Sequence, residues 1–167
     1  MTVSMAIALL ASPIASTVAA QAPKDQPVAA AVSPDSVVSL ARKLVGKRYV
    51  FGGTKPEIGF DCSGLLQYVW HAFKIDLPRN SAAQAKLGEP IPRDISKLHV
   101  GDLLTFGYRG KVSHIGIYTG NGKFVHASTG NRRVVESLLD RKPTRRVKPW
   151  IGARRLRVAT ASGTEGK

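Results

Sequence analysis

The stretch Asp61-Cys62-Ser63-Gly64-Leu65-Leu66 marks the point where a glycine-rich extended segment gives way to an apolar helix. Upstream of it, residues 49–53 read as a strand or loop that is closed by two glycines. The apolar residues around and after it recur at helical spacing: Leu65, Leu66, Val69, Trp70 and Phe73. The sequence therefore predicts a buried helix that runs to about Phe73 and holds Cys62 in its first turn.

Cys62 is the only cysteine among the 167 residues, so it can form no disulfide within the chain. At a helix start, unpaired backbone N–H groups and the positive end of the helix dipole favour a thiolate. We therefore expect the thiol pKa to lie below its usual value of about 8.5. A lone thiol in this position is a candidate nucleophile. The alternative is a small hydrophobic side chain that only fills space in the helix.

A helix is also predicted to start at Pro34, with Ser33 as its N-cap, and to end at Gly46. Its apolar face is expected to comprise Val37, Val38, Leu40, Ala41, Leu44 and Val45. A short helix capped by Asn80 or Ser81 should run through Ala85.

Beyond Leu98 the apolar pattern changes to that of short strands. The expected strands are residues 103–106, 114–119, 123–127, 133–136 and 150–156, and a Gly120-Asn121-Gly122 turn joins the second to the third. Helices followed by an antiparallel meander predict an α+β fold, with the N-terminal helices packed on the C-terminal sheet.

The two ends of the chain differ in composition from its middle. Residues 1–20 hold no charged side chain, contain an apolar run and end in small residues, as a signal peptide does, although no Lys or Arg precedes the run. A disordered tail that remains in the cytoplasm is the alternative. Residues 21–33 are expected to be a flexible linker, 34–157 a single folded domain and 158–167 a disordered tail.

The formal net charge is +14, and residues 131–160 carry ten basic against two acidic side chains. Such a surface attracts anionic polymers, including those of a cell wall. Nucleic acid is the weaker expectation, because the arginines of that span are accompanied by a single aromatic residue, Trp150, and no nucleic-acid motif is present. A merely solvated surface is the remaining alternative.

A thiol nucleophile needs a base that takes up its proton, and that base needs a partner that orients its ring. Of the four histidines, His71 and His99 read as surface residues, whereas His114 and His126 lie on two strands of one hairpin. With a plain two-residue turn, His126 would oppose Ile117, and the two histidines would point to opposite faces. A bulge or a three-residue turn would place both on one face, so counting alone does not decide the pairing.

From Tyr49 to Ala127 the chain closely resembles the NlpC/P60 family of bacterial cell-wall peptidases, which have a papain-like α+β fold. The motifs that carry the resemblance are Tyr49-Val50-Phe51-Gly52-Gly53, Asp61-Cys62-Ser63-Gly64-Leu65, Leu77-Pro78-Arg79, Gly101-Asp102-Leu103, Ser113-His114-Ile115-Gly116-Ile117-Tyr118 and Phe124-Val125-His126-Ala127. A weaker similarity extends it to nearly all of residues 35–156.

The resemblance implies that Cys62 is the nucleophile, His114 the base and His126 the group that orients His114. It further implies that the Tyr49 hydroxyl lies near the oxyanion, and that Asp61 and Ser63 contact the substrate. From the residues alone, Tyr49 could equally be a core aromatic, and Asp61 could simply cap the helix. No Cys/His cluster has the spacing of metal ligands, so we expect neither a metal nor another cofactor.

The resemblance thus implies an exported cysteine peptidase that hydrolyses an amide bond in peptidoglycan stem peptides, between D-glutamate and the diamino acid. The protein is expected to be monomeric, secreted, periplasmic or bound to the cell wall, and without a membrane span once mature. Two alternatives stay open: an amidase or transpeptidase of the same fold, and a basic wall-binding protein without catalytic activity.

Overall fold

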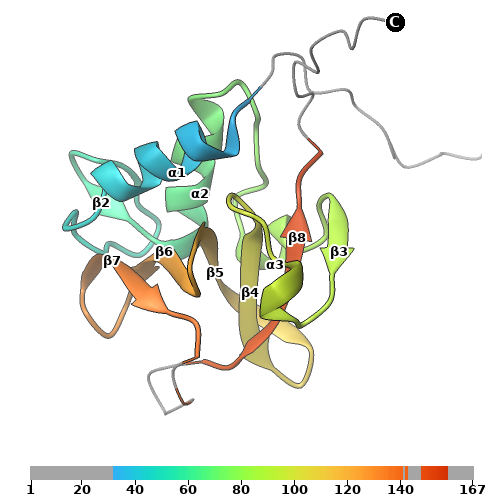
Figure 1. Cartoon of the computed structure of the whole chain (residues 1–167). Helices are drawn as coiled ribbons and strands as arrows, with labels where there is room; N and C mark the ends of the chain where they lie inside the picture. Colours follow the sequence, from blue (N-terminus) through green and yellow to red (C-terminus); the bar gives the residue numbers. More distant parts are fainter. Residues whose placement is uncertain (1–31, 141, 143–147, 158–167) are drawn as a thin grey trace, which may run out of the picture.

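The computed structural model describes residues 32–140, 142 and 148–157. The expected signal peptide, most of the expected linker and the C-terminal tail lie outside the described residues. Within them, two helices lie together against a larger antiparallel sheet, as Figure 1 shows. The α+β arrangement expected from the order of helical and strand patterns is therefore confirmed.

Helix α1 (Pro34–Lys43) begins as the sequence predicts, with Ser33 in an extended conformation and Pro34 in the first turn. It buries Val37, Val38 and Ala41. The expected apolar face was one residue too long, because Val45 lies beyond the helix end and is 45% exposed. Val32, which lies within the expected linker, is only 4% exposed and packs in the core.

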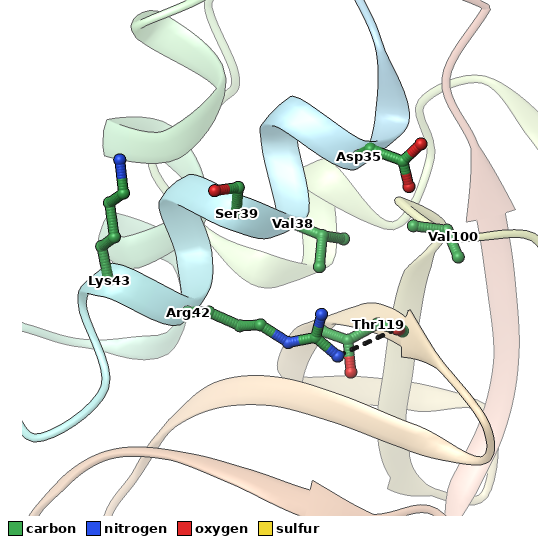
Figure 2. A pocket seen from close by; sticks show the side chains of 7 residues that line it. All are labelled: Asp35, Val38, Ser39, Arg42, Lys43, Val100 and Thr119. Carbon is green, nitrogen blue, oxygen red and sulfur yellow. Dashed lines mark hydrogen bonds between the residues drawn. The ribbon is translucent and has the colours of Figure 1, made fainter.

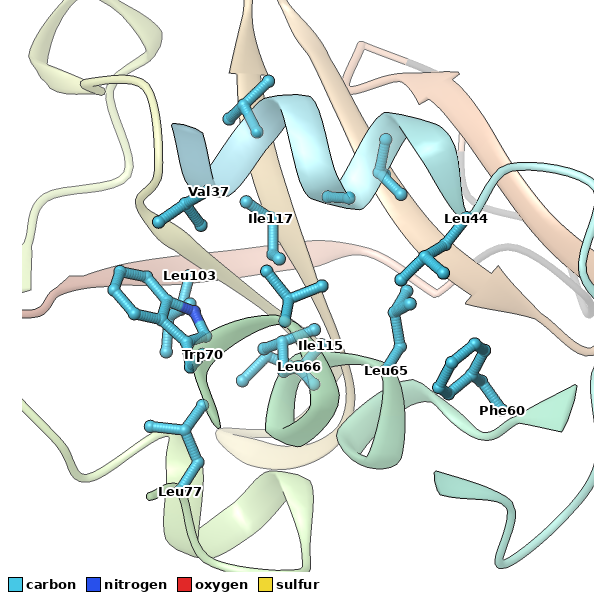
Figure 3. Close-up of a cluster of buried hydrophobic side chains, with 14 of the residues drawn as sticks. Val37, Leu44, Phe60, Leu65, Leu66, Trp70, Leu77, Leu103, Ile115 and Ile117 are labelled. Atoms are coloured by element: carbon cyan, nitrogen blue, oxygen red, sulfur yellow. The ribbon is translucent and has the colours of Figure 1, made fainter. Parts of the chain in front are cut away.

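Helix α2 (Cys62–His71) starts at Cys62 because Asp61 caps it. The Asp61 carboxylate accepts a hydrogen bond from the backbone N–H of Gly64 at 2.7 Å, which satisfies one of the unpaired donors of the first turn. The helix ends two residues before Phe73. Its apolar side enters the main hydrophobic core, where Leu65, Leu66 and Trp70 pack against residues of α1 and the sheet (Figure 3).

The large sheet has six strands in the order β3-β8-β4-β5-β6-β7. Their bounds are β3 (Glu89–Ile91), β4 (Leu103–Tyr108), β5 (Lys111–Gly120), β6 (Lys123–Ser128), β7 (Arg133–Leu138) and β8 (Trp150–Arg155). Strands β1 (Thr54–Lys55) and β2 (Gly59–Phe60) form a separate pair, and the short helical turns are α3 (Ser81–Gln84) and η1 (Ile95–Lys97). The sequence patterns did not predict β1, β2 or β3.

The two faces of the sheet carry different apolar clusters because successive residues of a strand point to opposite sides. One face packs on the helices and includes Leu103, Ile115, Ile117 and Val125. The opposite face carries a second cluster: Leu98, Leu104, Phe106, Tyr118, Phe124, Leu139 and Ala153. His114 and His126 have the strand parity of this second face.

A bulge in the β5–β6 hairpin decides where the two histidines point. Ile117 pairs with Val125, whereas Gly120 pairs with Lys123, so β5 holds one extra residue, Thr119. The turn itself is the expected two-residue Asn121-Gly122, and both of these residues have positive φ. Because the bulge shifts the register by one, His126 lies opposite Gly116 instead of Ile117. The looser hairpin that the sequence required is therefore present, and both histidines share a face.

The bulge is held from both sides by polar contacts. Thr119 donates from its hydroxyl to the Glu136 carboxylate of β7 at 2.7 Å, and its carbonyl accepts from Arg42 of α1 at 3.2 Å. Arg42 also pairs with Glu136 at 3.0 Å. Figure 2 shows Arg42 reaching Thr119 across a shallow pocket of about 500 Å³. The guanidinium in this pocket is already engaged, so its contacts fix the hairpin.

Candidate active site

Four of the six residues that the sequence singled out line one cavity of about 730 Å³: Tyr49, Cys62, His114 and His126. Cys62 enters it from the first turn of α2, His114 from β5 and His126 from β6. The backbone N–H of Ile115, next to His114, also donates a hydrogen bond to the Cys62 sulfur. The start of α2 and the histidine-bearing part of β5 are therefore adjacent.

The two histidine rings contact each other directly. Nε2 of His114 lies 2.7 Å from Nδ1 of His126, and the rings meet edge to face at 81°. Phe124 stacks on His126 with ring centroids 4.6 Å apart, and Phe106 packs against His114 at 5.7 Å. The bond to His126 uses only Nε2, so Nδ1 of His114 is the nitrogen that can exchange a proton with a nucleophile.

His114 is held neutral by its surroundings. Burial of the ring, together with the nearby His126 and the Lys148 ammonium, lowers its pKa to about 3. An imidazole with this pKa carries no charge near neutral pH. It can therefore accept a proton without first losing one.

The expectation of a lowered thiol pKa was wrong. Burial raises the pKa of Cys62, and the negative charge of Asp61 adds to that effect. Hydrogen bonds from the backbone N–H groups of Ile115 and Ser63, together with the charge of Lys148, act in the opposite direction. Because burial outweighs these donors, the resting site holds a neutral thiol beside a neutral imidazole.

Tyr49 also keeps its proton in this site. Burial raises the pKa of its hydroxyl, and the neighbouring Cys62 and Asp61 raise it further. A protonated hydroxyl in the cavity can donate a hydrogen bond to an oxygen that gains negative charge.

Asp61 and Ser63 are not among the residues that line the cavity, although the resemblance implied that both contact substrate. Their exposed fractions are 7% and 5%. Arg79 binds both oxygens of the Asp61 carboxylate, at 2.5 and 3.0 Å, and donates to the Ser63 hydroxyl at 3.0 Å. Burial alone would raise the pKa of Asp61, but Arg79 and the N–H groups of Gly64 and Gly52 hold it below its usual range. Both side chains thus fix the start of α2.

The sequence model of the NlpC/P60 family matches residues 46–150, which is well over half of the chain. The chain belongs to the NlpC/P60 family. The membership expected from the motifs is thereby confirmed.

Several curated relatives of this NlpC/P60 protein are similar to it. The gamma-DL-glutamyl hydrolase of Bacillus subtilis (strain 168) is 43% identical over 106 residues, which cover 61% of this chain and 25% of that protein. The murein DD-endopeptidase MepH of Escherichia coli (strain K12) is 39% identical over 116 residues, which cover 67% of this chain and 42% of that protein. A probable endopeptidase of Corynebacterium glutamicum (strain ATCC 13032) is 37% identical over 133 residues, covering 80% and 61%. The match thus spans less than two thirds of each relative.

Solved structures agree with the fold. An NlpC/P60 family protein from Bacillus cereus ATCC 10987 superposes with a TM-score of 0.67 at 28% identity, covering 75% of this chain and 41% of that one. The NlpC/p60 domain of the peptidoglycan hydrolase SagA superposes with a TM-score of 0.65 at 29% identity, covering 75% and 100%. The papain-like α+β fold is confirmed by these similarities.

Two residues of the NlpC/P60 site were not predicted from the sequence. Ser137 of β7 lies 3.2 Å from Nε2 of His126 through its hydroxyl oxygen. Lys148 lines the cavity and donates to the carbonyl of Ser113 at 3.1 Å. The strand pattern of residues 133–136 could have been extended to Ser137. The contact of Ser137 with His126, however, depends on the register between β7 and β6, which the sequence does not reveal.

The described part of the NlpC/P60 chain holds no group of three or more His, Cys, Asp or Glu side chains suited to a metal ion. None of the helices in residues 32–140 and 148–157 is long and apolar enough to cross a membrane.

Proposed function

We propose that this protein is an exported cysteine peptidase that hydrolyses amide bonds in the stem peptides of peptidoglycan. The observation that carries the proposal is the shared cavity of Cys62, His114 and His126, with the two imidazoles 2.7 Å apart. Membership of the NlpC/P60 family supports it. So do the printed names of its relatives, which include a murein DD-endopeptidase and a peptidoglycan hydrolase.

The first chemical step is the attack of the thiol on the amide carbon. The Cys62 proton passes to Nδ1 of His114 as the bond between sulfur and the carbonyl carbon forms. Because the pKa of His114 is low, the resulting imidazolium needs stabilisation. His126 accepts a hydrogen bond from Nε2–H of that imidazolium, and the negative charge that develops on the substrate oxygen lies nearby.

The oxygen that gains charge needs hydrogen-bond donors. The backbone N–H of Cys62 belongs to the first turn of α2, where amides have no partner within the helix. The Tyr49 hydroxyl, which stays protonated, is a second donor that lines the same cavity. Together they form an oxyanion hole in this proposal.

Breakdown of the tetrahedral intermediate completes the reaction. The carbon–nitrogen bond breaks, and His114 returns its proton to the departing amine, which leaves a thioester on Cys62. Water then attacks the thioester with His114 as base, and the acid is released with the free thiol. No metal ion takes part in this sequence of steps.

For the scissile bond we propose the one between D-glutamate and the diamino acid. Similarity to a gamma-DL-glutamyl hydrolase supports this assignment. Cavity residues Lys142 and Lys148 add positive charge that favours a substrate rich in carboxylates. The competing candidate is the bond of the peptide cross-link, because another relative is named as a DD-endopeptidase.

Digestion of defined muropeptides tests the proposal. The wild-type protein should release two fragments whose masses identify the bond, and Cys62→Ala should release neither.

His71→Gln is the matched control for His114→Gln, because His71 is an exposed histidine of α2 that pairs with Asp76. His114→Gln should lose activity and His71→Gln should keep it. Cleavage by Cys62→Ala would refute the mechanism, and loss of the muramoyl group or exchange of amines would instead indicate an amidase or a transpeptidase.

A further inference from the structure

Lys148 brings a positive charge to the wall of the catalytic cavity. It lies just before β8 and lines the cavity together with Cys62 and His114. Its ammonium donates a hydrogen bond to the backbone carbonyl of Ser113 at 3.1 Å, and Ser113 immediately precedes His114 on β5. Its charge also acts on the pKa of both Cys62 and His114. The ammonium therefore lies close to the proposed nucleophile and base, and a contact with the strand that carries the base holds it there.

Within the described part of the chain, this charge has no anionic partner. An ammonium has three N–H donors, and the carbonyl of Ser113 takes one of them. None of the ion pairs among residues 32–140, 142 and 148–157 includes Lys148. The described residues that line the cavity include a second lysine, Lys142, but no aspartate or glutamate. The complement of this cavity is therefore a substrate with an anionic group that accepts hydrogen bonds.

Lys148 is poorly suited to assist the proton transfer itself. Its positive charge favours the thiolate of Cys62, because it acts to lower the thiol pKa. The same charge opposes the imidazolium of His114, because it acts to lower the pKa of that ring as well. The two effects oppose each other when the proton moves from sulfur to nitrogen. A role in binding the substrate accounts for the position of the ammonium better than a role in the transfer.

The bond proposed for hydrolysis brings an anionic group close to the reacting carbonyl. D-Glutamate is joined to the diamino acid through its side-chain carboxyl, so its α-carboxylate stays free on the residue that supplies the scissile carbonyl. In an ordinary α-peptide bond that carboxyl group is itself part of the bond. Building on the proposed function, we infer that the Lys148 ammonium binds the α-carboxylate of the γ-linked D-glutamate and thereby determines the preference of the cavity for this bond.

Two tripeptides that differ only at the α-carboxyl group of D-glutamate test this role: L-alanyl-γ-D-glutamyl-meso-diaminopimelate and the same peptide with that group amidated. The wild type should cleave the acid with a kcat/KM roughly tenfold above that for the amide, because the amide lacks the charge-assisted hydrogen bond. In Lys148→Met the ratio should fall to about one, since methionine keeps an unbranched side chain and carries no charge. Lys148→Arg should keep the preference.

Lys111→Met is the matched control for the loss of a positive charge, because Lys111 is an exposed lysine of β5 that does not line the cavity. It should keep the wild-type preference for the acid. Equal rates of the wild type on the two peptides would overturn the role of Lys148. So would a Lys148→Met variant that retains the preference, even with a lower rate on both peptides. A preference that responds to amidation of the diaminopimelate, and not of the D-glutamate, would likewise refute it.

Binding to inactive protein separates the role of Lys148 from the proposed function. Calorimetric titration of Cys62→Ala should give a Kd roughly tenfold lower for the acid than for the amide, and Cys62→Ala combined with Lys148→Met should bind both alike. If the wild type cleaves neither peptide but this binding preference is present, the proposed function fails and the role of Lys148 is retained. If muropeptides are cleaved but Cys62→Ala binds both peptides equally, the role of Lys148 fails and the proposed function is retained.

Discussion

Burial and backbone donors compete at Cys62, and burial prevails. The helix start supplies N–H groups that favour a thiolate, and the sequence alone suggested that they would dominate. The surrounding side chains instead raise the pKa of Cys62, and burial of His114 lowers its pKa to about 3. In the proposed mechanism the thiolate is therefore formed during attack, when one proton transfer creates the charges on both groups. The position of a thiol in a helix can be predicted from sequence, whereas its burial depends on the whole fold.

The low pKa of His114 predicts a loss of stability in acid. In the unfolded chain a histidine takes up a proton near pH 6.5, whereas in the folded protein it does so only near pH 3. Between these values the unfolded state binds more protons, so stability falls as the pH falls. At about pH 5 the cost is about 2 kcal/mol relative to neutral pH. Urea unfolding at about pH 7.5 and about pH 5 should show it.

The matching control isolates His114 from the other titrating groups. In His114→Gln the difference in unfolding free energy between the two pH values should be smaller than in the wild type by about 2 kcal/mol. His71→Gln should keep the wild-type difference, because His71 is exposed and paired with Asp76. An acid sensitivity in His114→Gln equal to that of the wild type would show that His114 is not held neutral by burial.

Among elements, the β5–β6 hairpin is the one that assembles the site. Its bulge at Thr119 brings His126 opposite Gly116 and onto the face of His114. Gly116 leaves room for this arrangement: a Cβ there would lie 2.8 Å from the Phe124 ring and 3.2 Å from Cβ of His126. The bulge determines that His126 lies on the same face of the sheet as His114. The lack of a side chain at Gly116 allows His126 to pack closely against β5.

Gly116→Ala is therefore expected to affect both stability and catalysis. The added methyl group would meet Phe124, the backbone carbonyl of Val125 and His126, so accommodating it costs roughly 1–3 kcal/mol of unfolding free energy and moves the His126 ring. Thermal melting and muropeptide cleavage measure the two effects. Gly152→Ala in β8 is the matched control, since its nearest neighbour, Thr105 Oγ1, lies 3.7 Å away. Normal cleavage by Gly116→Ala would contradict the role given to this glycine.

The elements show where sequence patterns succeed and where they fail. Periodicity and capping predicted α1 and α2, and alternation predicted the five long strands, because each buries a continuous apolar face. Strands β1 and β2 have two residues each, and β3 contains Pro90, so none carries a readable alternation. The sequence showed that a bulge or a looser turn was required but not at which residue, because Thr119 is selected by contacts with α1 and β7.

Across the whole molecule, the last described strand completes the cavity. Strand β8 lies between β3 and β4 in the sheet, far from its neighbours in sequence, and the segment at its start brings Lys148 and Trp150 to the site. Such long-range pairing leaves no local signal, which is why Lys148 was not predicted. The three residues proposed for catalysis were found because they lie in short motifs, whereas Ser137 and Lys148 reach the site only through tertiary structure.

The charge of the whole chain predicts salt-dependent binding to an anionic wall. With a formal charge of +14, the inactive Cys62→Ala protein should bind purified peptidoglycan in about 0.1 M salt. Raising the salt to about 1 M shortens the screening length from about 10 Å to about 3 Å, so most of the bound protein should be released in a sedimentation assay. Peptidoglycan whose carboxylates have been amidated is the control, because it should bind weakly even at low salt. Binding that is indifferent both to salt and to amidation would mean that shape and hydrogen bonding at the cavity, not the overall charge, hold the protein on its substrate.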